Sequence, residues 1–147
     1  MKTQSGVGQN GFREESSSFS VTVSAGNVGS QATVTYTRGV DLSGTLQGAG
    51  GIGGLLARTD MGQWIGNDAN ANAYYISDGQ GNIIGLVNTN GWRVAHYKYD
   101  PYGNLLAESG PLAEANKYRF SSKEWDSQAG LYYYLYRFYD PNLQRWV

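Results

Sequence analysis

The sequence predicts an all-β fold of meandering antiparallel hairpins with little helix, and three observations lead to this prediction. Two similar stretches, YISDGQGNIIGL from Tyr75 and YKYDPYGNLLAE from Tyr97, lie 22 residues apart, and such a period indicates an array of identical supersecondary units. The composition favours strands and turns, with 12 Tyr, 21 Gly and 3 Pro in 147 residues. Short strand-like segments are separated by Gly, Asn and Asp. Because a lone hairpin is marginal in water, we expect neighbouring units to extend one sheet.

Each copy of the repeat is interpreted as a strand, a turn of the form Asp-x-x-Gly-Asn and a returning strand. Glycine after two turn residues can adopt positive φ, while Asp and Asn side chains hydrogen-bond to the nearby backbone. The residues predicted to set the repeat are Tyr75, Asp78, Gly81 and Asn82 in one copy and Tyr97, Asp100, Gly103 and Asn104 in the other.

The first half of the chain is predicted to begin with a poorly ordered leader, because residues 1–17 are polar and rich in Gly and Ser. Alternating apolar and polar residues at 18–24 predict a half-buried strand, and residues 31–39 form its expected hairpin partner. Nine glycines at 39–66 favour loops with short strands rather than a helix. Residues 18–66 are therefore expected to form a hairpin followed by a glycine-rich segment.

The two repeats, at 67–110, contain strands at regular spacing. The Asn90-Gly91 pair between two apolar segments is a strong signal for a hairpin. The predicted strands are residues 74–77, 82–87, 94–99 and 104–109.

The last segment, 111–147, begins with a break at Pro111. A single helical turn is expected at 112–117, followed by an extended Tyr-Arg-Phe at 118–120. Residues 131–140 are apolar or aromatic at nearly every position, which predicts one strand with both faces covered.

Composition argues against several function classes. The formal net charge is −1 and no basic block is present, so nucleic acid is not an expected partner. The chain has no cysteine and one histidine, His96, so no metal or cofactor is predicted and His96 is interpreted as an ordinary strand residue. No apolar stretch approaches about 20 residues, so no membrane contact is predicted. A formal G-x-G-x-x-G match at 48–53 lacks the required flanking strand and helix and is interpreted as a flexible loop.

Three stretches resemble the carboxy-terminal region of the rearrangement-hotspot (Rhs) and YD-repeat proteins. These are TYTRGVDLSGTLQGAGGIGGLLA at 35–57, the two repeats, and YRFSSKEWDSQAGLYYYLYRFYDPNLQRW at 118–146. The resemblance implies a β-spiral shell that encloses a toxic polypeptide, with the last segment plugging one end. The residues that match this plug are Arg119, Gly130, Leu131, Tyr132, Tyr133, Tyr139, Asp140, Pro141, Arg145 and Trp146.

The resemblance also bears on catalysis, because some members of that family cleave themselves with a pair of aspartates. Asp126 matches the first aspartate, and the second would follow Trp146, beyond Val147. An aspartyl mechanism needs two carboxylates that share a proton. Asp126 alone does not meet this need, and Asp140 is interpreted as a turn residue before Pro141. We therefore expect a vestigial site and no enzyme activity.

The leading hypothesis is a structural fragment, the terminal cap of a YD-repeat shell without its own toxin domain. Its expected partners are upstream YD repeats or other copies of the chain. Three alternatives stay open: a residual aspartyl self-cleavage module, a surface module that binds carbohydrate through Tyr and Trp, and self-assembly through an unpaired sheet edge. No secretory signal is visible in the sequence, while the family resemblance implies a secreted or cell-surface protein.

Overall fold

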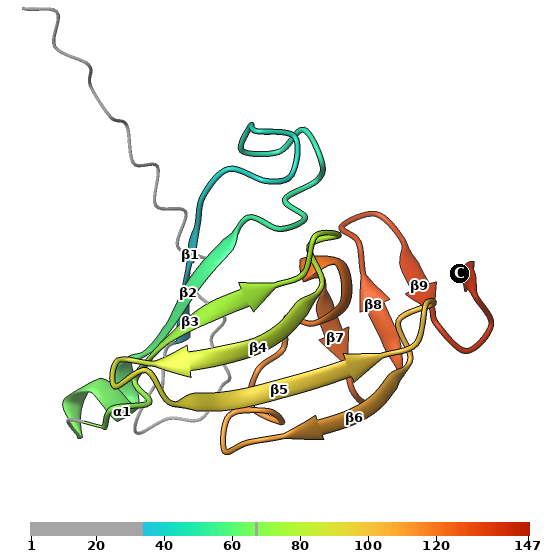
Figure 1. Ribbon diagram of the computed structural model, residues 1–147. Coiled ribbons are helices and arrows are strands. Elements are labelled where there is room, and N and C mark those ends of the chain that lie inside the picture. The colour runs from blue at the N-terminus through green and yellow to red at the C-terminus, as the bar shows by residue number, and fades with distance from the viewer. Residues whose placement is uncertain (1–33, 67) are drawn as a thin grey trace, which may run out of the picture.

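The computed structural model describes residues 34–66 and 68–147, and they form two antiparallel sheets (Figure 1). The all-β prediction with little helix is confirmed, since the described helices are the short α1 (Met61–Ile65) and a 3-10 turn at Phe120–Ser122. In the part of the chain that is described, no helix is long and apolar enough to span a bilayer.

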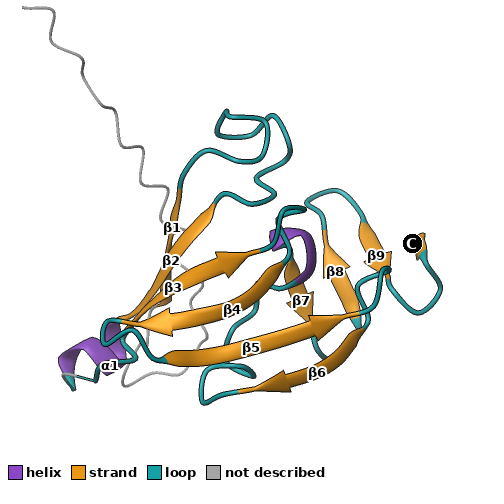
Figure 2. Ribbon diagram, in the orientation of Figure 1, coloured by secondary structure: helices purple, strands orange, loops and turns teal. Residues whose placement is uncertain are grey.

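Within the described residues, the larger sheet is a meander of six strands in sequence order (Figure 2). Every strand pairs with its neighbours in sequence, because connections of a few residues suffice between antiparallel strands. Its strands are β1 (Val34–Arg38), β2 (Leu55–Asp60), β3 (Asn72–Ser77), β4 (Ile83–Asn88), β5 (Arg93–Tyr99) and β6 (Leu105–Ser109).

The smaller sheet contains four short strands, also neighbours in sequence. They are β7 (Glu124–Asp126), β8 (Leu131–Tyr133), β9 (Phe138–Asp140) and β10 (Arg145–Trp146). Figure 1 shows the smaller sheet on the side of the larger sheet where the arrows of β3 and β5 end, with β9 next to the loop that joins β5 to β6.

The core lies on one face of the larger sheet. The strand register places Tyr75 opposite Leu86 and Leu86 opposite Ala95, so these side chains share that face. The buried cluster comprises Tyr36, Leu55, Ala73, Ile83, Leu86, Val94, Ala95, Tyr97, Leu112 and Ala113.

The four repeat-region strands are confirmed, with boundaries shifted by one or two residues. The Asn90-Gly91 hairpin is also confirmed, because this pair lies in the turn between β4 and β5. Gly91 has φ 77°, and the Asn88 N–H donates to the carbonyl of Trp92 at 2.9 Å. The positive φ explains why glycine occupies the position.

Two local predictions in the first and last segments need correction. The strand proposed at 18–24 lies outside the described residues, so its hairpin with residues 31–39 stays a prediction, and within the described residues Val34–Arg38 pairs with Leu55–Asp60. The glycine-rich segment includes the short helix α1, which was not expected; its first turn has a local cap, since Asp60 Oδ1 accepts the N–H groups of Gly62 and Gln63. The 118–120 stretch is extended only at its start, where Tyr118 makes an isolated antiparallel bridge with Glu124; positive φ at Ser121 and Ser122, 52° and 54°, turns the backbone just after it.

The prediction of a single buried strand at 131–140 was wrong. Leu135 has φ 68°, and the Tyr134 N–H donates to the Arg137 carbonyl, so this segment folds into the β8–β9 hairpin. Tyr132 is 1% exposed, whereas Tyr136 is 95% exposed. The run of aromatic residues therefore reflects contacts between neighbouring rings as well as burial, as in the tilted Tyr133–Phe138 pair with centroids 5.2 Å apart.

Candidate functional site

Three turns at the same end of the larger sheet contact the carboxy-terminal segment 111–147. They are the loop 39–54 between β1 and β2, the turn 78–82 between β3 and β4, and the turn 100–104 between β5 and β6. In a meander, every second connection falls at the same end of the sheet, so the sequence order brings these turns together. We call the three turns and the side chains that they hold the docking site.

The two repeat turns are built alike, residue for residue. The N–H of Asp78 donates to the carbonyl of Asn82 and that of Asp100 to Asn104, each at 2.9 Å. Both aspartates accept the Asn N–H through one carboxylate oxygen and the Asn amide through the other. Such side-chain bonds close an Asx turn and satisfy the backbone locally. They also lower the pKa of Asp100, with the Asn104 amide as the main cause.

The first repeat turn holds residues 119–122. Asn82 Oδ1 accepts the N–H of Ser121 at 2.8 Å, and the Ser122 hydroxyl donates to the Gly81 carbonyl at 2.7 Å. The adjoining backbone is joined as well, since the Ile83 N–H donates to the carbonyl of Arg119. The left-handed conformation of Ser121 and Ser122 is what brings these groups against the turn.

The second repeat turn holds the β8–β9 hairpin in the same manner. The Tyr132 hydroxyl donates to the Gly103 carbonyl and the Tyr139 hydroxyl to the Tyr102 carbonyl, each at 3.0 Å. The Asn104 amide, besides closing its own turn, donates to the carbonyl of Pro141. The Phe120 ring packs directly on Gly103, so a Cβ there would lie 2.7 Å from Phe120 Cδ1.

The loop 39–54 is organised around Asp41, a buried carboxylate. Its oxygens accept the Ser43 hydroxyl and the backbone N–H groups of Ser43, Ala49 and Gly51. These bonds, led by that of the Ser43 hydroxyl, lower the pKa of Asp41 to about 2. Lys123 reaches the outside of this loop and donates to the Gly50 carbonyl at 2.6 Å.

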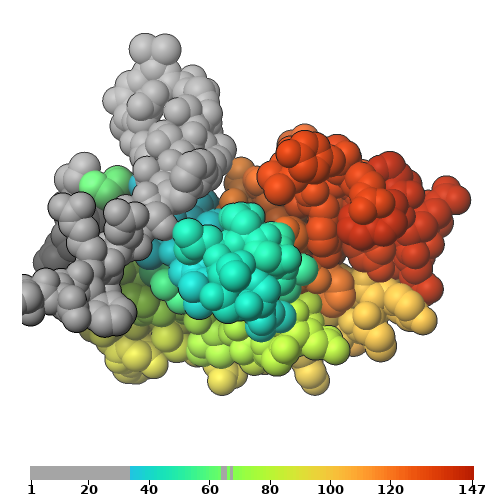
Figure 3. Space-filling model, turned by 90° about the horizontal axis from the view of Figure 1, so that it is seen from above, coloured from blue at the N-terminus to red at the C-terminus, as the bar shows by residue number. Residues whose placement is uncertain are grey.

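Figure 3 shows the loop 39–54 and the carboxy-terminal segment from above. The cyan surface of the loop 39–54 lies beside the orange and red surface of the carboxy-terminal segment. The Ser122 hydroxyl lies between two of the turns, because it also accepts the N–H of Gly53.

On the inner face of the sheet, tyrosines of both repeats reach one buried amide, Asn116. Tyr75 donates to Asn116 Oδ1 at 2.7 Å, and Asn116 Nδ2 donates to the hydroxyl of Tyr97 at 3.2 Å. Tyr97 in turn donates to the carbonyl of Ala113. Burial raises the pKa of Tyr75 and Tyr97, so both rings stay neutral donors. The repeated tyrosine thus holds the segment 111–118 on the sheet.

Arg119 places a buried charge beside this network. The residue is 5% exposed, and its guanidinium pairs with Glu108 at 3.1 Å and donates to the Ala113 carbonyl. It also lies over the ring of Tyr97, 5.2 Å from the centroid. A buried cation is costly unless it is paired and hydrogen-bonded. Arg119 is both, so it fixes one position of the segment relative to β5 and β6.

Asp126, the candidate vestigial catalytic residue, lies at the end of β7. Its Oδ1 accepts the backbone N–H groups of Gln128 and Ala129, at 2.9 and 3.0 Å. Gly130 completes this turn with φ 69°, so the geometry gives Asp126 a turn-forming role. Among the described residues, no three acidic or histidine side chains gather closely enough to hold a metal ion.

The remaining predicted plug residues lie in the smaller sheet. Asp140 accepts the N–H groups of Asn142 and Leu143 and forms the turn into β10 with Pro141. The exposed residues Tyr133 and Arg145 do not reach the core. Trp146 packs on Tyr134 with centroids 4.8 Å apart. Leu131 is half-buried opposite Asp126.

Sequence reasoning missed the groups that receive these contacts: Asn116, Ser122, Glu108 and Asp41. Asp41 was detectable, because the sequence Asp41-Leu-Ser-Gly44-Thr places a glycine three residues after an aspartate, as in both repeats. The other three carry no local pattern, because their partners lie far away in the sequence.

The comparisons with known proteins agree with this architecture. No family model matches the chain. The chain is 32% identical over 84 residues to the tRNA3(Ser)-specific nuclease WapA of Bacillus spizizenii, covering 56% of this chain and 4% of that protein. It is 34% identical over 73 residues to the uncharacterized protein YibJ of Escherichia coli K12, covering 50% and 31%. It is 39% identical over 77 residues to salivary gland surface protein 1 of Aedes aegypti, covering 50% and 2%.

Among solved structures, the crystal structure of TcdB2-TccC3 shares the fold with a TM-score of 0.61. The match has 23% identity and covers 82% of this chain and 6% of that one. The chain therefore spans a small part of each solved structure and less than a third of each of these curated relatives. The likeness shows a shared all-β fold and is consistent with the Rhs and YD-repeat resemblance of the sequence.

Proposed function

We propose that this chain is a structural part of a YD-repeat shell, its terminal cap. The observation that carries the proposal is the docking site, where the turns of successive repeats bind the carboxy-terminal segment through their own backbone carbonyls. Gly81 and Gly103 each present a carbonyl to a hydroxyl of that segment. The segment is thereby folded back onto the sheet instead of extending it, which is what closing a strip of hairpins requires.

The partner under this proposal is a preceding series of YD repeats that extends the larger sheet from the β1 side. In the described residues β1 pairs with β2 alone. A strand edge offers unpaired N–H and C=O groups for a further strand. The stacked units of a repeat protein are stabilised by such neighbour contacts.

A chimera tests the proposal. The corresponding end of a YD-repeat shell protein is replaced by residues 34–147, and the enclosed polypeptide is challenged with an added protease. We expect a closed shell by electron microscopy and protection equal to that of the parent protein. The matched control carries Asn82→Ala and Asn104→Ala, which remove one contact to the segment from each repeat turn. A correctly folded chimera whose cargo is digested as fast as in a shell without its end would refute the cap function.

Self-cleavage through Asp126 is a second candidate, favoured by one observation. Asp126 lines the same cavity as Glu108, Glu114 and Glu124, so the chain offers further carboxylates on that cavity, and an aspartyl mechanism would need one of them to share a proton with Asp126. The intact mass of the purified chain, followed over days at several pH values, decides this point. Loss of mass that Asp126→Asn abolishes would support self-cleavage, and a constant mass would exclude it.

A further inference from the structure

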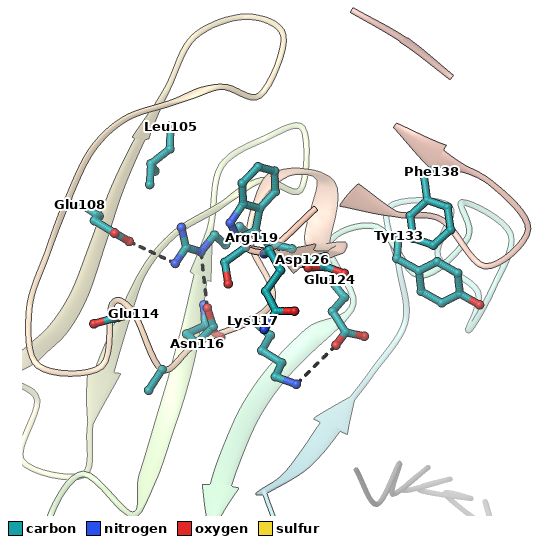
Figure 4. A pocket seen from close by; sticks show the side chains of 14 residues that line it. Leu105, Glu108, Glu114, Asn116, Lys117, Arg119, Glu124, Asp126, Tyr133 and Phe138 are labelled. Carbon is teal, nitrogen blue, oxygen red and sulfur yellow. Dashed lines mark hydrogen bonds and ion pairs between the residues drawn. The ribbon is translucent and has the colours of Figure 1, made fainter. Parts of the chain in front are cut away.

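The last strand of the larger sheet has an edge that opens beside a cavity. Among the described residues, β6 pairs with β5 only, and residues 106–109 are exposed. The cavity, of about 900 Å³, lies between β6, the segment 114–119 and the smaller sheet (Figure 4). Leu105 and Glu108 of β6 line it. An exposed strand edge beside a cavity is the arrangement used to bind an extended peptide as an added strand.

The charged residues that line the cavity indicate what kind of peptide it would bind. Four carboxylates line the cavity, together with the two cations Lys117 and Arg119. Each cation is paired with one carboxylate: Arg119 with Glu108 at 3.1 Å and Lys117 with Glu124 at 3.8 Å, as the dashed lines in Figure 4 show. Within the described part of the chain, Glu114 and Asp126 are the two lining carboxylates without an ion pair, and four carboxylates against two cations give the cavity lining a net negative charge.

The wall opposite β6 is aromatic. Trp125, Tyr133 and Phe138 line the cavity from the smaller sheet. Figure 4 shows the rings of Tyr133 and Phe138 together, with centroids 5.2 Å apart, and both side chains are exposed. Aromatic faces attract guanidinium and ammonium groups. A ligand with cations on apolar stems would therefore meet both carboxylates and rings.

We propose that the edge of β6 and this cavity bind an extended basic polypeptide segment by strand addition. In an added strand, alternate side chains point to the same face of the sheet. Glu108 lies opposite Tyr97 and therefore shares the inner face with it, so every second ligand residue points into the cavity. The preferred ligand has Arg or Lys at every second position, with small or β-branched residues between them. The proposal stands apart from the cap function, because it needs no upstream repeats.

The test uses the full chain and fluorescein-labelled peptides in fluorescence anisotropy. The probe is a nine-residue peptide that alternates Arg with Thr. The first control has the same composition, with all Arg residues at one end. The second control is the alternating peptide with N-methyl groups on every second residue, which removes its ability to pair as a strand. We expect both controls to bind about tenfold more weakly than the probe, since neither can combine strand pairing with the cavity contacts.

A variant pair assigns the binding to this cavity. Glu114 is exposed and has no ion pair within the described residues, so Glu114→Lys should fold and should weaken probe binding about tenfold by like-charge repulsion. Asp68→Lys changes the net charge equally in the loop before β3 and should leave the affinity unchanged. If the probe and the peptide with all Arg residues at one end bind with equal affinity, binding is diffuse charge attraction and the proposal is overturned. An equal loss of affinity in Glu114→Lys and Asp68→Lys would overturn it in the same way.

Two further outcomes are decisive. If Glu114→Lys fails to fold, the comparison between the probe and its N-methyl form on the natural chain still decides whether strand pairing occurs. If sedimentation shows that the chain self-associates and that the probe does not compete, a second copy occupies the edge and the basic-peptide proposal is wrong.

Discussion

Replacing Gly103 by alanine tests whether the second repeat turn is packed against the carboxy-terminal segment. Gly103 has φ 94°, and an added Cβ would lie 2.7–3.0 Å from three atoms of the Phe120 ring. Phe120 is held between Tyr99 and Tyr132, with centroids 5.8 and 5.9 Å away, so the ring cannot move aside freely. The Cβ must therefore displace the ring or distort the turn.

Gly91 provides a matched control. It has φ 77° and lies in a turn of the same hydrogen-bond pattern, but nothing lies within 4 Å of its added Cβ. The cost of a non-glycine residue in the left-handed region, about 1–2 kcal/mol, applies to both variants. The entropy change of the unfolded chain is also shared. Overpacking adds about 1–3 kcal/mol at Gly103 alone.

The measurement is chemical unfolding followed by tryptophan fluorescence, with thermal melts in parallel. Trp125 packs against Tyr132 at 4.6 Å between centroids, so the signal reports on the contact that Gly103 supports. We expect Gly103→Ala to unfold with about 2–5 kcal/mol less stability than the natural chain, against about 1–2 kcal/mol for Gly91→Ala. The difference corresponds to about 3–10 °C in melting midpoint. Equal losses in the two variants would refute the docking of residues 119–141 on the repeat turns.

Three further predictions concern the tyrosine network and pH. Tyr97→Phe should cost about 1–3 kcal/mol of unfolding free energy, because the Asn116 amide loses a buried partner. Tyr74→Phe should cost almost nothing, because the Tyr74 ring is exposed and its hydroxyl makes no hydrogen bond within the described residues, and equal urea midpoints of the two variants would contradict the network. The pKa of Asp41 is lowered to about 2, so its carboxylate stabilises the fold above the unfolded pKa of about 4, and this contribution is lost as pH falls toward 2. Asp41→Asn should therefore reduce the loss of unfolding free energy at acid pH in urea titrations, and an unchanged pH dependence would exclude Asp41 as its source. Burial raises the pKa of Tyr36 to about 12, so stability should fall as pH rises above about 10, where the unfolded tyrosines ionise first; tyrosinate absorbance that appears well before unfolding would contradict this order. Burial raises the pKa of Tyr75, Tyr97, Tyr99 and Tyr132 in the same direction.

The meander and its turns follow from local sequence. Asp, Gly and Asn at fixed spacing close each turn with bonds inside five residues, so the pattern of Asp100 to Asn104 is complete without the rest of the molecule. Side chains two residues apart in a strand point to the same face, so local sequence also places Ala95 and Tyr97 of β5 on one face. The sequence alone therefore predicted the four strands of the repeat region and the Asn90-Gly91 hairpin between two of them.

The tertiary structure decided how the carboxy-terminal segment lies on that sheet. The contacts of Asn116 with Tyr75 and of Ser122 with Gly81 join residues 41 apart, and no periodicity encodes such pairs. The aromatic run at 131–140 predicted one buried strand. The positive φ of Leu135 divides it into a hairpin in which the rings of Tyr133 and Phe138 pack against each other. Local patterns specify elements because their partners are near in sequence. The partners of the remaining hydrogen-bond donors, acceptors and charges are determined only when the whole chain is folded, because folding sets the distances between residues that are far apart in sequence.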